Sequence, residues 1–205
     1  MTGRGAVFEA ATGDGPPLPD READPAAAER RAAEVRVAYE GLLQIRRLTA
    51  PAGTDPGTAP APWERKQPVR AVALALEAAG FPPSALDAEG RRVRTGYRVG
   101  PGERPGQVRV DWPGPPGGGA AQEEETALAG CARALERLGW EALLYRGPRR
   151  RRHLEVEPMP APGRPADRPA DRPAVAAPTA GACGGGGARL RPPAPCGEPG
   201  ALSEK

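Results

Sequence analysis

Residues 123–157 constrain the fold of this chain more than any other stretch of its sequence. Apolar residues recur at helical spacing over 128–138, which predicts a helix with one buried stripe. A glycine and a tryptophan follow at 139–140, a pair typical of a helix end at which the glycine is left-handed. Two strand-like runs come next, at 142–146 and 152–157. This stretch therefore predicts a helix followed by a two-stranded hairpin.

An earlier region of the chain has the same order of elements. A helix is expected over 68–80, and alternation of apolar and polar residues then predicts strands at 93–99 and 108–112. Residues 73–81 also match residues 132–140 in their small residues, their Leu-Glu pair and their glycine followed by an aromatic residue. The match indicates either an internal duplication or a helix ending that is common in proteins.

The predicted order across residues 63–158 is therefore α-β-β-α-β-β. We expect an α+β domain, a small two-layer sandwich in which a four-stranded antiparallel sheet carries both helices on one face. The chain has 28 glycines and 28 prolines among its 205 residues, a level typical of partly disordered sequence. Residues 1–23 and 159–205 lack periodicity, so we expect disordered tails at both ends of the chain.

Residues 24–49 predict an amphipathic helical arm before the domain. The helix begins at an Asp-Pro pair, which supplies an N-cap acceptor and a proline in the first turn. Val35, Tyr39 and Leu42 lie on its apolar face. A linker at 50–62, rich in proline, glycine and threonine, would let the arm move relative to the domain. The apolar face therefore either binds a protein partner or a second copy of the chain, or completes the core of the domain.

Several classes of function are disfavoured by what the sequence lacks. It has no run of about 18 apolar residues, so we expect no membrane-spanning helix. Its first residues lack the basic and apolar regions of a secretory signal, so we expect a cytoplasmic protein.

The sequence also offers little for catalysis. His153 is the one histidine and has no nucleophile motif beside it, which favours a surface histidine over a catalytic one. Together with Cys131, Cys183 and Cys196, it does not readily supply the full ligand set of a zinc site. We therefore expect a protein without enzymatic activity, metal or cofactor.

Arginine supplies nearly all of the positive charge and gives the best indication of a binding site. The formal net charge is +3, although the abundance of arginine also fits the coding bias of a GC-rich genome. If Val93, Val108 and Val110 point into the core, arginines occupy the opposite face of the sheet. The predicted nucleic-acid-binding residues are Arg92, Arg94, Arg98 and Arg109 on that face, with Arg149, Arg150, Arg151 and Arg152 at the turn between the last two strands.

A cationic sheet face with a basic turn predicts salt-dependent binding to the phosphates of DNA or RNA. Against this, four acidic residues lie on or near the same face and can pair with the arginines: Asp111, Glu141, Glu155 and Glu157. Tyr97 and Trp112 are expected to face inward, where they cannot stack on bases. We expect a non-catalytic binding protein with nucleic acid as its partner, or alternatively a protein-interaction or dimerisation module that uses the N-terminal helix.

Overall fold

The computed structural model describes residues 8–147 and 151–159. The predicted arginines at 149 and 150 and the tails at 1–7 and 160–205 lie outside the described residues. The described helices are α1 (Pro25–Thr49), α2 (Pro62–Lys66), α3 (Pro68–Ala78) and α4 (Ala120–Glu136), with a short 3-10 helix η1 (Pro56–Thr58). The described strands are β1 (Ala85–Leu86), β2 (Arg92–Arg94), β3 (Arg98–Pro101), β4 (Val108–Asp111), β5 (Trp140–Arg146) and β6 (Arg152–Pro158).

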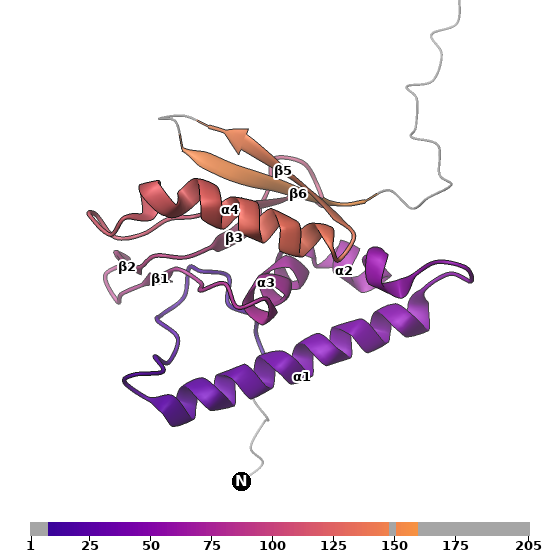
Figure 1. The fold of residues 1–205 in the computed structure, drawn as a ribbon, viewed down its shortest axis with the longest axis horizontal. Coiled ribbons are helices and arrows are strands. Elements are labelled where there is room, and N and C mark those ends of the chain that lie inside the picture. The colour runs from indigo at the N-terminus through magenta and orange to yellow at the C-terminus, as the bar shows by residue number, and fades with distance from the viewer. Residues whose placement is uncertain (1–7, 148–150, 160–205) are drawn as a thin grey trace, which may run out of the picture. The chain divides into compact units, whose positions relative to one another are not determined.

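The four-stranded antiparallel sheet that the sequence predicts is confirmed. Its strand order is β3-β4-β6-β5, and every neighbouring pair is antiparallel. On one face of this sheet, α3 packs against β3 and β4 while α4 packs against β5 and β6 (Figure 1). None of the helices in the described part of the chain is both long and apolar enough to span a membrane.

Alternation along the strands builds the core between this sheet and its two helices. Val108 and Val110 of β4 are fully buried, as are Leu154 and Val156 of β6. They meet apolar side chains of α3 and α4, among them Leu135, which is also fully buried. The residues between them in each strand point to the opposite face, which we call the open face.

The strand expected at 93–99 is divided in two, which corrects the sequence analysis. β2 pairs with β1 in a separate two-stranded sheet, and β3 begins only at Arg98. The break lies at Gly96, where an added Cβ would stand 2.2 Å from the carbonyl oxygen of Pro82. Val93 is consequently 45% exposed and not part of the core, whereas Tyr97 is buried as predicted.

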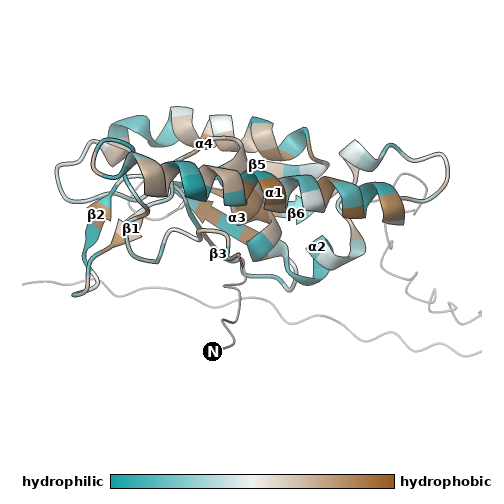
Figure 2. Cartoon of the chain, turned by 90° about the horizontal axis from the view of Figure 1, so that it is seen from below, coloured by the Kyte–Doolittle hydropathy of each residue, from teal (hydrophilic) through white to brown (hydrophobic). Residues whose placement is uncertain are grey.

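The helical arm packs on the domain. α1 lies against α3 on the side away from the sheet, below α3 in Figure 1 and in front of it in Figure 2. Its start is as predicted, because the Asp24 carboxylate accepts a hydrogen bond of 2.9 Å from the backbone N–H of Ala27. Val35 and Leu42 are buried in the core, and Tyr39 packs against it partly buried.

The expected linker at 50–62 is also held in place. It contains η1 and the first residue of α2. Arg46 of α1 donates hydrogen bonds of 2.7 Å to each carboxylate oxygen of Glu64 in α2, and both side chains are 1% exposed. The same guanidinium group donates to the carbonyl oxygens of Gly57 and Leu138, which ties the linker to the chain just after α4.

The N-terminal residues differ from the expectation of disorder through residue 23. Thr12 accepts a hydrogen bond of 2.7 Å from the backbone N–H of Val99 in β3. Gly13 has φ +88° and lies so close to the chain at Tyr97 that a Cβ would stand 2.2 Å from its carbonyl oxygen. These contacts come from distant parts of the sequence, so no local periodicity could predict them.

Candidate anion-binding site

Five of the predicted arginines surround one hollow, of about 450 Å³, at one end of the four-stranded sheet. Its lining residues are Arg92, Arg98, Arg109, Asp111, Pro113, Glu124, Arg151 and Arg152. We call this the arginine hollow. Five guanidinium groups and two carboxylates give its lining a formal charge of +3. Arg94, which the sequence grouped with these residues, does not line the hollow.

Strand register brings the lining residues together. Arg98 of β3 is directly opposite Asp111 of β4, and Asp111 is opposite His153 of β6. Directly opposed residues in antiparallel strands point to the same face, so these side chains form one row across the open face. Arg152 precedes His153 at the start of β6 and by alternation lies on the helix side, where it pairs with Glu125 of α4, so it reaches the hollow at the end of the sheet and not from this row.

Each described arginine of the predicted site is paired with a carboxylate. Asp14 contacts both Arg92 and Arg98, at 2.5 and 2.7 Å, and Asp20 lies 3.5 Å from Arg94. The remaining pairs are Arg98 and Arg109 with Asp111, Arg151 with Glu124, and Arg152 with Glu125. Of the expected acidic partners only Asp111 takes this role. Asp14 and Asp20 come from residues that were expected to be disordered, and Glu124 and Glu125 come from α4, whose acidic residues the sequence analysis did not consider as partners of the arginines.

The open face as a whole is not cationic, which corrects the predicted charge distribution. Glu155 and Glu157 lie on it and accept hydrogen bonds of 2.9 and 3.0 Å from the side-chain amide of Gln107. Arg104 from the loop after β3 also pairs with Glu157, at 2.5 Å. The positive charge is therefore concentrated at the arginine hollow.

Glu124 is the most buried charged group of the hollow. Its side chain is 3% exposed, and one carboxylate oxygen accepts a hydrogen bond of 2.9 Å from the backbone N–H of Arg152. The other oxygen lies 2.8 Å from Nε of Arg151, but the N–H of that group is not directed at it, so this oxygen accepts no hydrogen bond from the described residues. Glu124 thus fixes the start of β6 against α4 and holds Arg151 beside the hollow.

The two neighbouring arginines lower the pKa of the Asp14 carboxyl. Burial raises the pKa of its carboxyl, but the hydrogen bonds from Arg98 and Arg92 outweigh burial and hold the pKa below its ordinary value of 3.8. A carboxyl with a lowered pKa in the folded state contributes stability above its unfolded pKa, and this contribution is lost as pH falls through the folded pKa. Acidification should therefore weaken the attachment of the N-terminal residues to the hollow.

We expect Arg98→Ala to raise the pKa of Asp14, because the substitution removes one of the two guanidinium groups that lower it. Carboxyl-carbon NMR titration of the variant and the unaltered chain measures the change. Asp87 is the internal control, since its pKa is lowered mainly by the backbone N–H of Arg91 and should not move. An unchanged Asp14 titration would contradict the ion pair between Asp14 and Arg98.

His153 is buried, not on the surface as the sequence suggested. It is 7% exposed, and its ring stacks on Tyr145 with the ring centroids 6.0 Å apart. Its Nε2 lies 3.7 Å from Glu155, while its Nδ1 has no hydrogen-bond partner within residues 8–147 and 151–159. Tyr145 is 42% exposed on the open face, an aromatic residue that the sequence analysis did not single out. Its place opposite His153 follows from the hairpin register.

The other reactive groups in the described part of the chain form no second chemical site. Burial raises the pKa of the Cys131 thiol to about 12, so this cysteine stays protonated at neutral pH. Within the ranges that the structure describes, no cluster of three or more histidine, cysteine, aspartate or glutamate side chains is placed to hold a metal ion.

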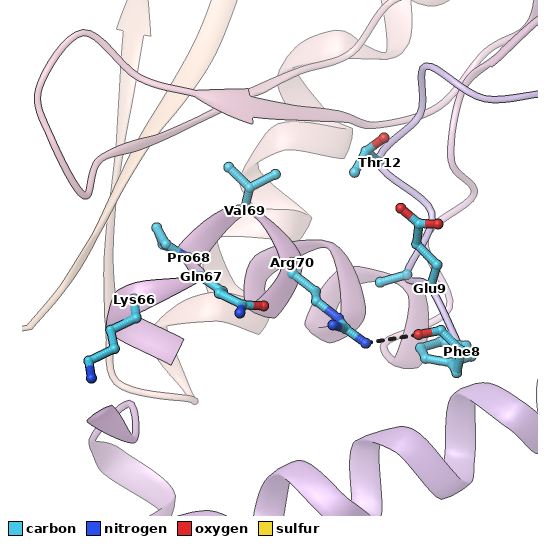
Figure 3. A pocket seen from close by; sticks show the side chains of 9 residues that line it. Phe8, Glu9, Thr12, Lys66, Gln67, Pro68, Val69 and Arg70 are labelled. Atoms are coloured by element: carbon cyan, nitrogen blue, oxygen red, sulfur yellow. Dashed lines mark hydrogen bonds between the residues drawn. The ribbon is translucent and has the colours of Figure 1, made fainter. Parts of the chain in front are cut away.

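A second hollow, of about 550 Å³, lies between the N-terminal residues and the start of α3. Figure 3 shows Phe8, Glu9 and Thr12 on one side of it and the first turn of α3 on the other. Arg70 closes part of this space by donating a hydrogen bond of 2.9 Å to the carbonyl oxygen of Phe8. Glu9, Lys66, Gln67 and Arg70 of this lining are exposed, and the charges of Glu9, Lys66 and Arg70 are of mixed sign.

The predicted partner-binding residues pack against the core of the chain itself. Val35 is 7% exposed and Leu42 is 2% exposed, and both belong to the core that contains α3. Tyr39 also packs against this core. The structure therefore supports the alternative in which the apolar face of the arm completes the domain.

Comparison of the chain with protein-family models, curated proteins and solved structures finds no similar protein.

Proposed function

We propose that this chain is a non-catalytic protein that binds nucleic-acid phosphates in the arginine hollow. The observation that carries the proposal is the convergence of five guanidinium groups, from four strands and the residue before β6, on one space of about 450 Å³. Guanidinium groups present several N–H donors in one plane and bind phosphate oxygens in pairs. Arg98 and Arg109 keep 43% and 37% of their side-chain surface exposed, so a phosphate can reach them beside their carboxylate partners.

The proposed binding depends on charge and is largely independent of base sequence. Phosphate contacts position a protein on nucleic acid without reading its bases. Tyr145 is the one exposed aromatic side chain that the described residues place on the open face, whereas proteins that recognise single strands usually stack several bases. We therefore expect duplex and single strand to bind with similar affinity and a steep dependence on salt.

Fluorescence anisotropy of a labelled random duplex and a labelled single strand, titrated with the full chain, tests the proposal. We expect a Kd of about 10 µM or tighter at low salt. The double variant Arg98→Ala with Arg109→Ala should weaken binding by roughly a hundredfold, at about tenfold for each lost charged hydrogen bond. Its salt dependence should fall by a slope of about 2 for the duplex, because two phosphate contacts are lost.

The matched control is Arg36→Ala with Arg47→Ala. It removes the same charge from two exposed arginines of α1 that do not line the hollow. This control should change the affinity by less than about threefold, since distant charges act only through a screened field. Equal losses in the two double variants would place the binding outside the hollow. No binding by the unaltered chain at low salt would refute the proposal.

A further inference from the structure

The two edge strands of the four-stranded sheet, β3 and β5, differ in whether another segment covers their outer backbone groups. On the β3 edge, the backbone N–H of Val99 is bonded to Thr12, and Gly13 packs against the adjoining chain. The β5 edge has no such cover, because β5 pairs only with β6 among the described residues. An uncovered edge strand presents unpaired backbone groups to which another strand can bind.

The hydrogen bonds at the two ends of the hairpin show which backbone groups of β5 face outward. The carbonyl oxygen of Gly139 accepts from the N–H of Met159, and the N–H of Gly147 donates to the carbonyl oxygen of Arg151. In an antiparallel pair every second residue bonds the facing strand. Residues 141, 143 and 145 are separated from Gly139 and Gly147 by even numbers of residues, so they also bond β6. The N–H and C=O groups of residues 140, 142, 144 and 146 therefore point away from the sheet.

The side chains of this edge are apolar on both faces. Leu143, Leu144 and Tyr145 are consecutive and 48%, 44% and 42% exposed. Alternation places Leu143 and Tyr145 on the open face and Leu144 on the helix face. The strand has no proline or bulge, and its two charged residues, Glu141 and Arg146, lie near its ends, so the usual features that keep an exposed edge from pairing are missing from its centre. Such a strand is suited to pairing with another strand.

We propose that β5 pairs with β5 of a second copy of this chain, antiparallel and with the two-fold axis at Leu143. This register pairs residue 140 with 146 and residue 142 with 144, so all of the outward backbone groups are used. Leu143 meets Leu143 of the second copy at a non-hydrogen-bonded position, where side chains are closest.

Backbone pairing distinguishes this register from its neighbours. A two-residue shift centres the axis on Ala142 or on Leu144, and it leaves residue 146 or residue 140, respectively, without a partner in β5. In the proposed register Glu141 lies opposite Tyr145 of the second copy, and no like charges are directly opposed. A four-residue shift that centres the axis on Glu141 would bring two carboxylates together, which is unfavourable. One register therefore pairs all four outward residues of β5.

Sedimentation equilibrium of the full chain measures the association. We expect a dimer that dissociates on dilution, and Leu143→Lys should raise its dissociation constant at least tenfold, because two ammonium groups would meet at the axis. Val37→Lys is the matched control, since it places the same charge on a 69% exposed valine of α1 and should leave the dimer unchanged. Far-UV circular dichroism checks that both variants are folded.

Cysteine cross-linking tests the register itself. In a chain whose Cys183 and Cys196 are serine, Leu143→Cys should form a disulfide-linked dimer on mild oxidation, because the two copies of residue 143 would be about 4.5 Å apart between Cα atoms. Leu144→Cys should not, since residue 144 is paired with residue 142. A monomeric chain at about 100 µM, a dimer unaffected by Leu143→Lys, or cross-linking at 144 and not at 143 would overturn the proposal.

Discussion

Replacing Glu64 with alanine is expected to lower the free energy of unfolding by about 3–5 kcal/mol. Glu64 and Arg46 form a bidentate pair with both side chains 1% exposed. The substitution leaves the Arg46 guanidinium buried without its counter-charge, which costs much more than the pair itself contributes. It also removes the acceptor for the backbone N–H of Ala61. Urea denaturation followed by circular dichroism measures the loss.

Glu34→Ala is the matched control for this experiment. Glu34 is 59% exposed and lies 3.9 Å from Arg31, so its removal should change the free energy of unfolding by less than about 1 kcal/mol. A Glu64→Ala variant as stable as Glu34→Ala would show that the Arg46 side chain reaches water in solution. The linker would then not be held against the domain by this pair.

The elements that local periodicity governs are those that the sequence predicts. The stripe of α4, the helical arm and the strands of the last hairpin each bury one face, and burial imposes a period that can be read from the residues. The packing of the linker could not be predicted in this way. Arg46 and Glu64 are 18 residues apart, and charged residues of this kind are usually exposed to solvent. Only the tertiary structure decides that these two charges become buried.

In the candidate site, too, the residues governed by local alternation could be predicted and those placed by long-range contacts could not. Alternation correctly placed Arg109 on the face opposite Val108 and Val110. Asp14, however, is 84 residues from its partner Arg98 in a segment without periodicity, so its role could not be inferred. The misplacement of Val93 has a comparable cause, because the break after β2 arises from contact between Gly96 and Pro82. Contacts between residues far apart in the sequence therefore account for the parts of the site that local patterns could not predict.

Gly139→Ala is expected to lower the free energy of unfolding by about 2–5 kcal/mol. Gly139 follows α4 with φ +77°, a conformation that costs an alanine about 1–2 kcal/mol. An added Cβ would also stand 2.0 Å from the carbonyl oxygen of Thr58, in the linker that Arg46 holds. Overlap with backbone forces a local shift that costs about 1–3 kcal/mol more. Urea denaturation again measures the effect.

Two other glycines separate the causes of this loss. Gly80 occupies the corresponding position after α3, with φ +84° and no atom within 4 Å of an added Cβ, so Gly80→Ala should show the backbone strain alone. Gly41 lies within α1 with no such neighbour, and Gly41→Ala should stabilise the chain by up to about 1 kcal/mol. Equal losses for Gly139→Ala and Gly80→Ala would mean that Thr58 does not press against the end of α4. A larger loss at Gly139 would place the linker against the domain independently of the Arg46–Glu64 pair.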